Sequence, residues 1–218
     1  MADNKTSQMI ALLGAMRKQM NGAVADAMYY YGADYGLNYG VSLPTVRQIA
    51  NNVEKDHNLA LYLYKQQVRE LRLAALHVAK AEEITTGEIA IWAEGVINSE
   101  IAEEIAFTLL PRTTIFHEIY SAWSAGDSEF CVYAALMAAA RSELAKQSEI
   151  VRGVQSIIER FPASRIIAQG AVALLAAAFN NEELRDEVKS VVAQAEKEAN
   201  NSSAASYVAE EMGWRMEF

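Results

Sequence analysis

Two glutamates one helical turn apart are the residues of this chain whose types and spacing come nearest to acid–base chemistry. Glu100 and Glu104 stand four positions apart in the stretch from Asn98 to Leu110, so a helix there places both carboxylates on one face. Each charge raises the pKa of the other group, which is how a pair of carboxylates divides the roles of general acid and general base. Both are catalytic candidates. The alternative is a solvated helix surface rich in glutamate.

Arginines form the second group with chemical potential, because guanidinium groups bind phosphate oxygens. In the first half of the chain Arg47 and Arg69 are candidates for phosphate contact, and in the second half Arg141, Arg152 and Arg165 are. The alternative is structural: charged pairs between neighbouring helices, with Glu70 binding Arg47 or another helix end. The net charge of −9 opposes non-specific attraction to nucleic acid, so any DNA contact would require a local cluster of these arginines.

Other classes of site have no support in the sequence. Cys131 is the single cysteine and cannot form an internal disulfide, and the three histidines are scattered without helical ligand spacing. No glycine-rich phosphate loop precedes a helix. We therefore expect neither a metal nor a cofactor. The chain has no run of about 20 apolar residues and no basic start followed by an apolar stretch, so we expect a cytoplasmic protein with no membrane partner.

The elements that must position these residues are helices. Only three prolines and 11 glycines interrupt long runs of good helix formers, and alternating β-strand patterns are missing. Helices are expected, among others, after a cap at Thr6 or Ser7, from Leu43-Pro44 onward, over 99–110 and over Ser128–Ala145. The whole chain, residues 1–218, is expected to form one domain.

Small apolar pairs recur along the chain and indicate a helical repeat. Their spacings are 31, 29 and 38 residues, for the pairs Ala75-Leu76, Ala106-Phe107, Ala135-Leu136 and Ala173-Leu174. Irregular periods of this length are typical of degenerate helix pairs of the HEAT or ARM type, which stack into a curved α-solenoid. A helical bundle is the alternative fold.

Two segments carry a resemblance to a known family. The stretch from Gly40 to Ala50, Gly-Val-Ser-Leu-Pro-Thr-Val-Arg-Gln-Ile-Ala, and the stretch from Arg69 to Leu76, Arg-Glu-Leu-Arg-Leu-Ala-Ala-Leu, resemble the AlkD-like DNA alkylation repair glycosylases. The resemblance covers roughly residues 20 to 180. It implies a HEAT-like solenoid that holds double-stranded DNA on its concave face and, in active members, releases an alkylated purine.

The resemblance also implies which residues would carry the chemistry. In the family a tryptophan and an aspartate lie one turn apart on a mid-chain helix, and an arginine on a later helix assists them. The matching positions here are Glu100 and Glu104 or, after a shift of one residue, Ile101 and Ile105; the arginine position falls near Tyr133. Because none of the three expected residues is present, we expect no release of alkylated purine.

Aromatic side chains elsewhere are candidates for binding a base. Tyr31, in a cluster of tyrosines, is the best match to a family tyrosine that approaches the modified base. Trp92 and Trp123 are candidates to replace the lost stacking residue from other helices. Burial in the core is the alternative for both tryptophans, and packing of rings with the hydroxyls in water is the alternative for the tyrosines.

The acidic middle of the chain separates two hypotheses for function. Seven glutamates and no lysine or arginine lie between Glu82 and Glu104, which repels phosphates wherever these residues face DNA. The first hypothesis is a family member that binds DNA structure without glycosylase activity. The second is a non-enzymatic scaffold that binds a protein partner on its concave surface, in line with the acidic charge and the methionines of the first helix.

Overall fold

The structure is a computed structural model that describes residues 2–33 and 35–217, and most of these residues are helical. Apart from a single parallel bridge between Leu37 and Val68, the described residues contain no β structure. Contacts divide the chain into two compact units, Met1–Thr114 and Ile115–Phe218. The expectation of one domain over 1–218 stays a prediction.

Unit 1 is built around one central helix. Its helices are α1 (Ala2–Arg17), α2 (Gly22–Tyr30), α3 (Leu43–Asn51), α4 (His57–Tyr64), α5 (Arg69–Val78), α6 (Ile89–Gly95) and α7 (Ser99–Thr108). All residues of α5 except Arg72 are buried, and α1, α3, α4 and α7 pack against it. Three of its buried residues, Arg69, Glu70 and His77, are polar, so the centre of unit 1 requires charged partners from neighbouring helices.

Side-chain caps fix where the helices of unit 1 begin. The Ser42 hydroxyl accepts the N–H of Thr45 at 3.3 Å, and a proline lies in the first turn of α3, as predicted from Leu43-Pro44. Asn98 caps α7 by accepting the N–H of Ile101 at 3.1 Å. Since an uncapped helix start leaves donors without partners, these residues set the bounds of α3 and α7 and thereby the positions of Glu100 and Glu104.

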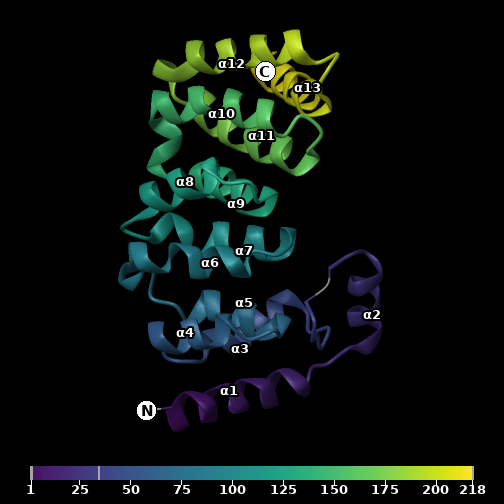
Figure 1. The fold of residues 1–218 in the computed structure, drawn as a ribbon, viewed down its shortest axis with the longest axis vertical. Helices are drawn as coiled ribbons and strands as arrows, with labels where there is room; N and C mark the ends of the chain where they lie inside the picture. Colours follow the sequence, from purple (N-terminus) through teal and green to yellow (C-terminus); the bar gives the residue numbers. More distant parts are fainter. Residues whose placement is uncertain (1, 34, 218) are drawn as a thin grey trace. The chain divides into compact units, whose positions relative to one another are not determined.

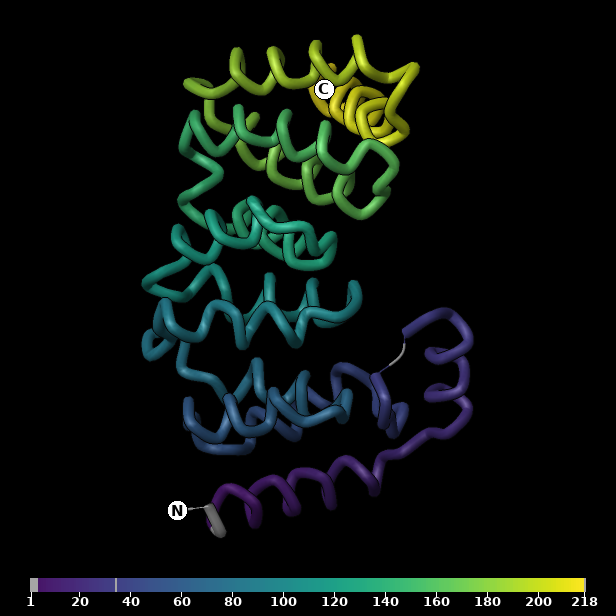
Figure 2. The backbone as a smooth tube through the Cα atoms, viewed as in Figure 1, coloured from purple at the N-terminus to yellow at the C-terminus, as the bar shows by residue number. Residues whose placement is uncertain are grey.

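Unit 2 consists of closely packed helix pairs. Its helices are α8 (Phe116–Ala125), α9 (Glu129–Ala139), α10 (Ser148–Arg160), α11 (Arg165–Phe179), α12 (Arg185–Glu198) and α13 (Ser203–Glu217), which follow one another from teal to yellow in Figures 1 and 2. Gly170 of α11 faces α9 so closely that an added Cβ would lie 3.1 Å from Tyr133 and Leu136. Small residues thus allow the backbones of α9 and α11 to approach.

The all-α class and the helix-pair organisation expected from the sequence are confirmed, whereas three expected boundaries are wrong. The helix expected over 99–110 ends at Thr108. The first helix begins at Ala2, before Thr6 and Ser7. The helix expected over Ser128–Ala145 ends at Ala139, and a 3-10 helix follows from Glu143 to Lys146. The Ser142 hydroxyl accepts the N–H of Leu144 at 3.2 Å, and this competing local bond starts a new element. No helix in the described part of the chain is long and apolar enough to cross a membrane.

Candidate functional site

Glu104 of α7 lies at the centre of a buried ion-pair network. Its side chain is 1% exposed, and it accepts hydrogen bonds from the Nε of Arg47 at 2.9 Å and from the Nε2 of His77 at 2.6 Å. A second guanidinium nitrogen of Arg47 donates to the other carboxylate oxygen. Helices α3 and α5 therefore both bind α7 through one carboxylate.

The surroundings of Glu104 keep this carboxylate ionised. Burial by itself raises the pKa of a carboxyl group, but the hydrogen bonds from His77 and Arg47, together with their charges, outweigh it and lower the pKa of Glu104 to about 2. A group with that pKa carries no proton at neutral pH. It cannot act as a general acid, and its oxygens are already occupied by donors, which makes it a poor base.

Glu100 belongs to a second network one turn earlier. Arg69 of α5 donates from Nε to Glu100 at 2.8 Å, and from Nη1 to the Val41 carbonyl at 2.7 Å and to Glu70 at 3.1 Å. Burial by itself lowers the pKa of Arg69. The hydrogen bond to Glu100 and the negative charge of Glu100 outweigh burial and raise the pKa of Arg69. Tyr35 donates to Asn98 at 3.0 Å and also contacts Glu100. Burial first, and then Glu100, raise the pKa of this phenol.

These contacts do not support the catalytic pair expected from the sequence. Glu100 and Glu104 do lie on one helix, but each is bound by a different arginine, so neither carboxylate depends on the other for a proton. The expected pair is absent because Arg47 of α3 and Arg69 and His77 of α5 bind the two carboxylates of α7. A signal was present in the sequence: the otherwise apolar run of α5 contains four ionisable residues, and an ionisable residue buried in such a run requires partners.

Glu70 has a structural role, though not with Arg47. Its carboxylate accepts the backbone N–H groups of Tyr39 and Val41, each at 3.2 Å, as well as Arg69. The sequence suggested Arg47 or another helix end as the partner of Glu70. Glu70 binds the chain that leads into α3, and Arg47 binds Glu104 instead. The segment between α2 and α3 is fixed to α5 by backbone bonds to a buried carboxylate.

The aromatic candidates divide into buried and exposed residues. Trp92 is 1% and Trp123 is 4% exposed, whereas Tyr31 is 84% exposed. The ring of Trp92 packs against Tyr64 with 4.6 Å between ring centres. Both tryptophans are core residues, which differs from the expected base-binding role because each faces the apolar side of its helix. Tyr31 is accessible to a ligand.

The arginine candidates divide in the same way. Arg69 is fully buried, so it presents no surface to a phosphate, in contrast to the expectation; Arg47 exposes 41% of its side chain but is bound to Glu104. Arg141, Arg152 and Arg165 are exposed in unit 2. Arg152 of α10 lines a shallow hollow with Lys197 of α12, and the guanidinium of Arg165 lies 3.9 Å from the ring centre of Tyr207. The accessible cations of unit 2 are thus spread over several helices.

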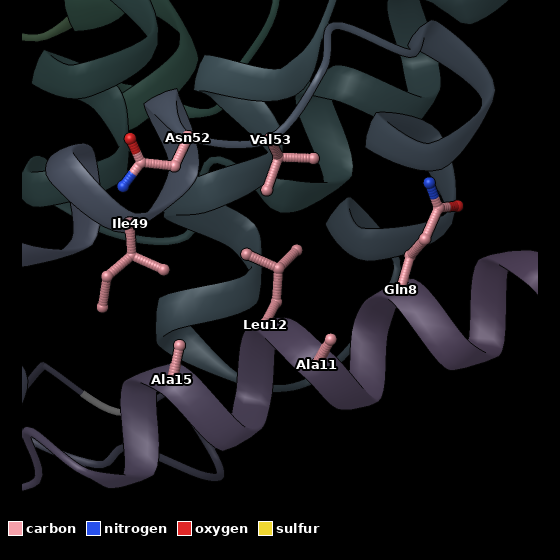
Figure 3. Close-up of a pocket in the computed structure, with 7 residues that line it drawn as sticks. All are labelled: Gln8, Ala11, Leu12, Ala15, Ile49, Asn52 and Val53. Carbon is pink, nitrogen blue, oxygen red and sulfur yellow. The ribbon is translucent and has the colours of Figure 1, made fainter.

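An apolar groove lies between α1 and α3 of unit 1. It has a volume of about 330 Å³ and is lined by Gln8, Ala11, Leu12, Ala15, Ile49, Asn52 and Val53. Figure 3 shows the side chains of α1 and α3 facing each other across it. Apolar side chains dominate this lining, which suits an apolar ligand better than a charged one. Among the described residues, no three His, Cys, Asp or Glu side chains come together as metal ligands.

Comparisons with known proteins agree with this description. The family profile described as DNA alkylation repair enzyme matches residues 12–161. A solved structure described as "A new family of proteins related to the HEAT-like repeat DNA glycosylases with affinity for branched DNA structures" is similar in fold, with a TM-score of 0.68 and 14% sequence identity over 84% of this chain and 80% of that one. Curated proteins give no match. The all-α fold of helix pairs is thus a HEAT-like repeat fold.

Proposed function

The chain belongs to the DNA alkylation repair enzyme family, and from that membership we propose that it binds DNA by its structure, branched DNA included, without cleaving a glycosidic bond. One observation carries the second half of the proposal. The family's catalytic pair falls on Glu100 and Glu104 or, after a shift of one residue, on Ile101 and Ile105. The two carboxylates are bound by Arg69 and by Arg47 with His77, and the two isoleucines carry no charge. A carboxylate that stabilises a developing positive charge must face the substrate.

DNA binding is supported by the family and by a solved relative of similar fold whose own description states affinity for branched DNA. We propose that the exposed arginines of unit 2, Arg141, Arg152 and Arg165, contact phosphates. Arg152 has a neighbouring cation in Lys197, and two cations on adjacent helices suit a phosphate backbone better than one. The cytoplasmic location expected from the sequence remains a prediction.

Two measurements test this proposal. Affinity for a four-way DNA junction and for linear duplex of the same composition is measured at two salt concentrations. We expect binding that weakens as salt rises, and a double variant Arg152→Gln/Lys197→Gln that lowers the salt slope by about 1 for each lost phosphate contact. Lys146→Gln is the matched control, because Lys146 is exposed and already paired with Glu143. Absence of binding even at low salt contradicts the proposal.

Release of alkylated base is measured separately, with methylated duplex as substrate. We expect no release above the uncatalysed rate. If the wild type does release base and Glu100→Gln or Glu104→Gln abolishes the release while the fold is retained, then the assignment of these carboxylates as structural is wrong.

The groove between α1 and α3 favours a second candidate function, that of a protein-interaction scaffold. An apolar hollow beside the exposed side of a helix is a common docking place for an amphipathic helix. The DNA measurements separate the two: a scaffold of this kind predicts no salt-dependent binding to either DNA, and an Ile49→Glu substitution in the groove leaves DNA affinity unchanged under the first proposal.

A further inference from the structure

The groove between α1 and α3 extends over two turns of α1. Its lining residues on α1 are Gln8, Ala11, Leu12 and Ala15, and their spacing of three, four and seven positions places them on one face of the helix. Leu12 is 4% exposed, whereas Ala11 is exposed and Ala15 is half-buried. The groove therefore has an apolar floor, and the small alanine side chains leave room for a larger side chain to reach it.

The two helices that form the groove carry cations and no acid. Residues 4–19 and 43–53 contain no aspartate or glutamate. After α3 come Glu54, Lys55 and Asp56, which together add one negative charge, and the Asp56 carboxylate is occupied as the cap of α4, where it accepts the N–H of Leu59 at 2.9 Å. The surroundings of the groove are thus positive, although the chain as a whole is acidic. The cations of the two stretches are Lys5, Arg17, Lys18 and Arg47.

Two of these cations flank the apolar strip of α1. Lys5 stands three positions before Gln8, and Lys18 stands three positions after Ala15, so one lysine lies about a helical turn beyond each end of the strip. Arg47 is already bound to Glu104. An occupant that suits this groove has a large apolar side chain in its middle and a negative charge on either side of it.

The last helix of the chain, α13, has these features. Trp214 is 64% exposed, although the opposite side of the helix is buried in unit 2. Glu210 stands four positions before Trp214 and Glu217 three positions after it, and both glutamates are exposed on the same face as the indole. The third acid, Glu211, pairs with Arg215 at 2.6 Å. An exposed tryptophan between two carboxylates is a surface that suits an apolar site with a positive rim.

The two sets of charges also match in length. At a rise of 1.5 Å per residue, Lys5 and Lys18 lie about 20 Å apart along α1, and Glu210 and Glu217 lie about 10 Å apart along α13. A helix laid along the groove with Trp214 at its middle leaves about 5 Å along the axis between each glutamate and the nearer lysine. The flexible four-carbon stem of a lysine can span that difference.

We propose that the groove between α1 and α3 binds α13 of a second copy of this chain. The indole of Trp214 enters the groove, and Glu210 and Glu217 lie beside the two lysines that flank it. The contact is heterologous, because each copy offers one groove and one α13, so association continues from copy to copy unless the rotation closes a ring. This inference does not rest on the proposed DNA binding. It names the occupant of the groove that the second candidate function leaves open.

Charge is the reason for choosing this occupant. A contact between two grooves brings lysines together and a contact between two α13 helices brings glutamates together, whereas the groove and α13 have opposite charges. DNA is excluded as the occupant because the apolar lining offers its phosphates no partner. An acidic helix of a different protein is the remaining alternative, and the test must be able to detect that case.

Two variants of the full chain separate the two halves of the contact. Trp214→Ala removes the inserted side chain and keeps the groove, and Ala11→Glu places an acid in the groove and keeps α13. Both positions are exposed, so both variants are expected to fold, which circular dichroism and the melting temperature verify. Ile10→Glu is the matched control, because it adds the same charge to α1 at a position that is 60% exposed and does not line the groove.

Sedimentation velocity is measured from roughly 10 to 500 µM, since a contact of this small area is expected to be weak. We expect the wild type and Ile10→Glu to associate as concentration rises, and less so as salt rises. Trp214→Ala and Ala11→Glu are each expected to associate at least about tenfold more weakly. A mixture of these two variants is the decisive sample: one supplies the groove and the other supplies α13, so they are expected to form a heterodimer that grows no further.

Three results would overturn the proposal. A wild type that stays monomeric at every concentration leaves a different protein as the partner of the groove. Association that neither variant weakens places the contact elsewhere on the surface. Variants that are monomeric alone and remain monomeric when mixed indicate a symmetric contact, since a heterologous one is restored by mixing. None of these results bears on the DNA measurements, so the two proposals fail or stand separately.

Discussion

Replacing Glu104 by glutamine is expected to destabilise unit 1 in a pH-dependent way. The pKa of Glu104 falls from an ordinary value of 4.5 to about 2, and one pKa unit corresponds to about 1.4 kcal/mol, so its ionised form stabilises the folded state by about 3 kcal/mol. Because the folded-state pKa is the lower one, this stabilisation is complete above about pH 4.5 and is lost as the pH falls toward 2. At pH 3 about 1 kcal/mol of it remains by the same relation.

Urea unfolding at pH 7, 5 and 3 measures this difference. The chain has three tryptophans, and with Trp123 and Trp214 replaced by phenylalanine the buried Trp92 reports the unfolding of unit 1 by fluorescence. In that background Glu104→Gln is expected to lose about 3 kcal/mol at pH 7 and progressively less toward pH 3. Glu94→Gln, at an exposed position of α6, is the control and is expected to change stability little at all three pH values.

Three results would refute this reasoning. A variant about as stable as the wild type at pH 7 would mean that Arg47 and His77 do not hold the carboxylate as described. A loss that stays constant down to pH 3 would mean that the side chain acts through packing and not through its charge. A gain in stability would indicate a catalytic role for Glu104, since replacing a strained catalytic group commonly stabilises an enzyme.

Three further outcomes are expected. Tyr35→Phe removes the donor to Asn98 and Glu100 from a buried site and is expected to cost about 1–3 kcal/mol in urea unfolding, whereas Tyr29→Phe alters an exposed hydroxyl and is expected to cost nothing measurable. Gly95→Ala places a Cβ 2.2 Å from the ring of Tyr64 and is expected to lower stability by about 1–3 kcal/mol, with a lower melting temperature as the readout; a neutral result would show that α4 and α6 can separate. The Cys131 thiol is 5% exposed, and burial raises its pKa, so a thiol reagent is expected to modify it slowly in buffer and rapidly in urea.

The sequence was a good guide to the helices and a poor one to the partners of charged residues. The cap at Ser42, directly before Leu43-Pro44, and the cap at Asn98 are local signals, because each accepts the N–H of a residue three positions later. The pairing of Glu104 with Arg47 and His77 joins residues 57 and 27 positions apart. No periodicity of a single helix contains that information, and only the packing of α3 and α5 against α7 supplies it.

The candidate site shows the same limit. Trp92 has the chemistry to bind a base and Arg69 the chemistry to bind a phosphate, so residue type alone predicts that both belong to a DNA-binding site. Burial decides otherwise: the structure leaves them 1% and 0% exposed. Tyr31 has the same kind of chemistry and is exposed, and the distinction follows from α2 having no neighbour that covers it, a tertiary fact that its own sequence does not contain.

The attachment of α2 by its ends has a consequence for how this protein can change. The start of α2 is held by the bond from the Asn21 N–H to the Tyr39 carbonyl, and none of its nine residues is buried. Apart from Met28, whose sulfur accepts a hydrogen bond from Asn38, the side chains of α2 therefore face few demands from folding. Substitutions in α2 are therefore expected to change the solubility and the folding of unit 1 little, so this short segment can vary in evolution independently of the other helices. Proteins that share this fold can therefore differ in what they bind through about nine residues. A different peptide could also be engineered between the same two points of attachment.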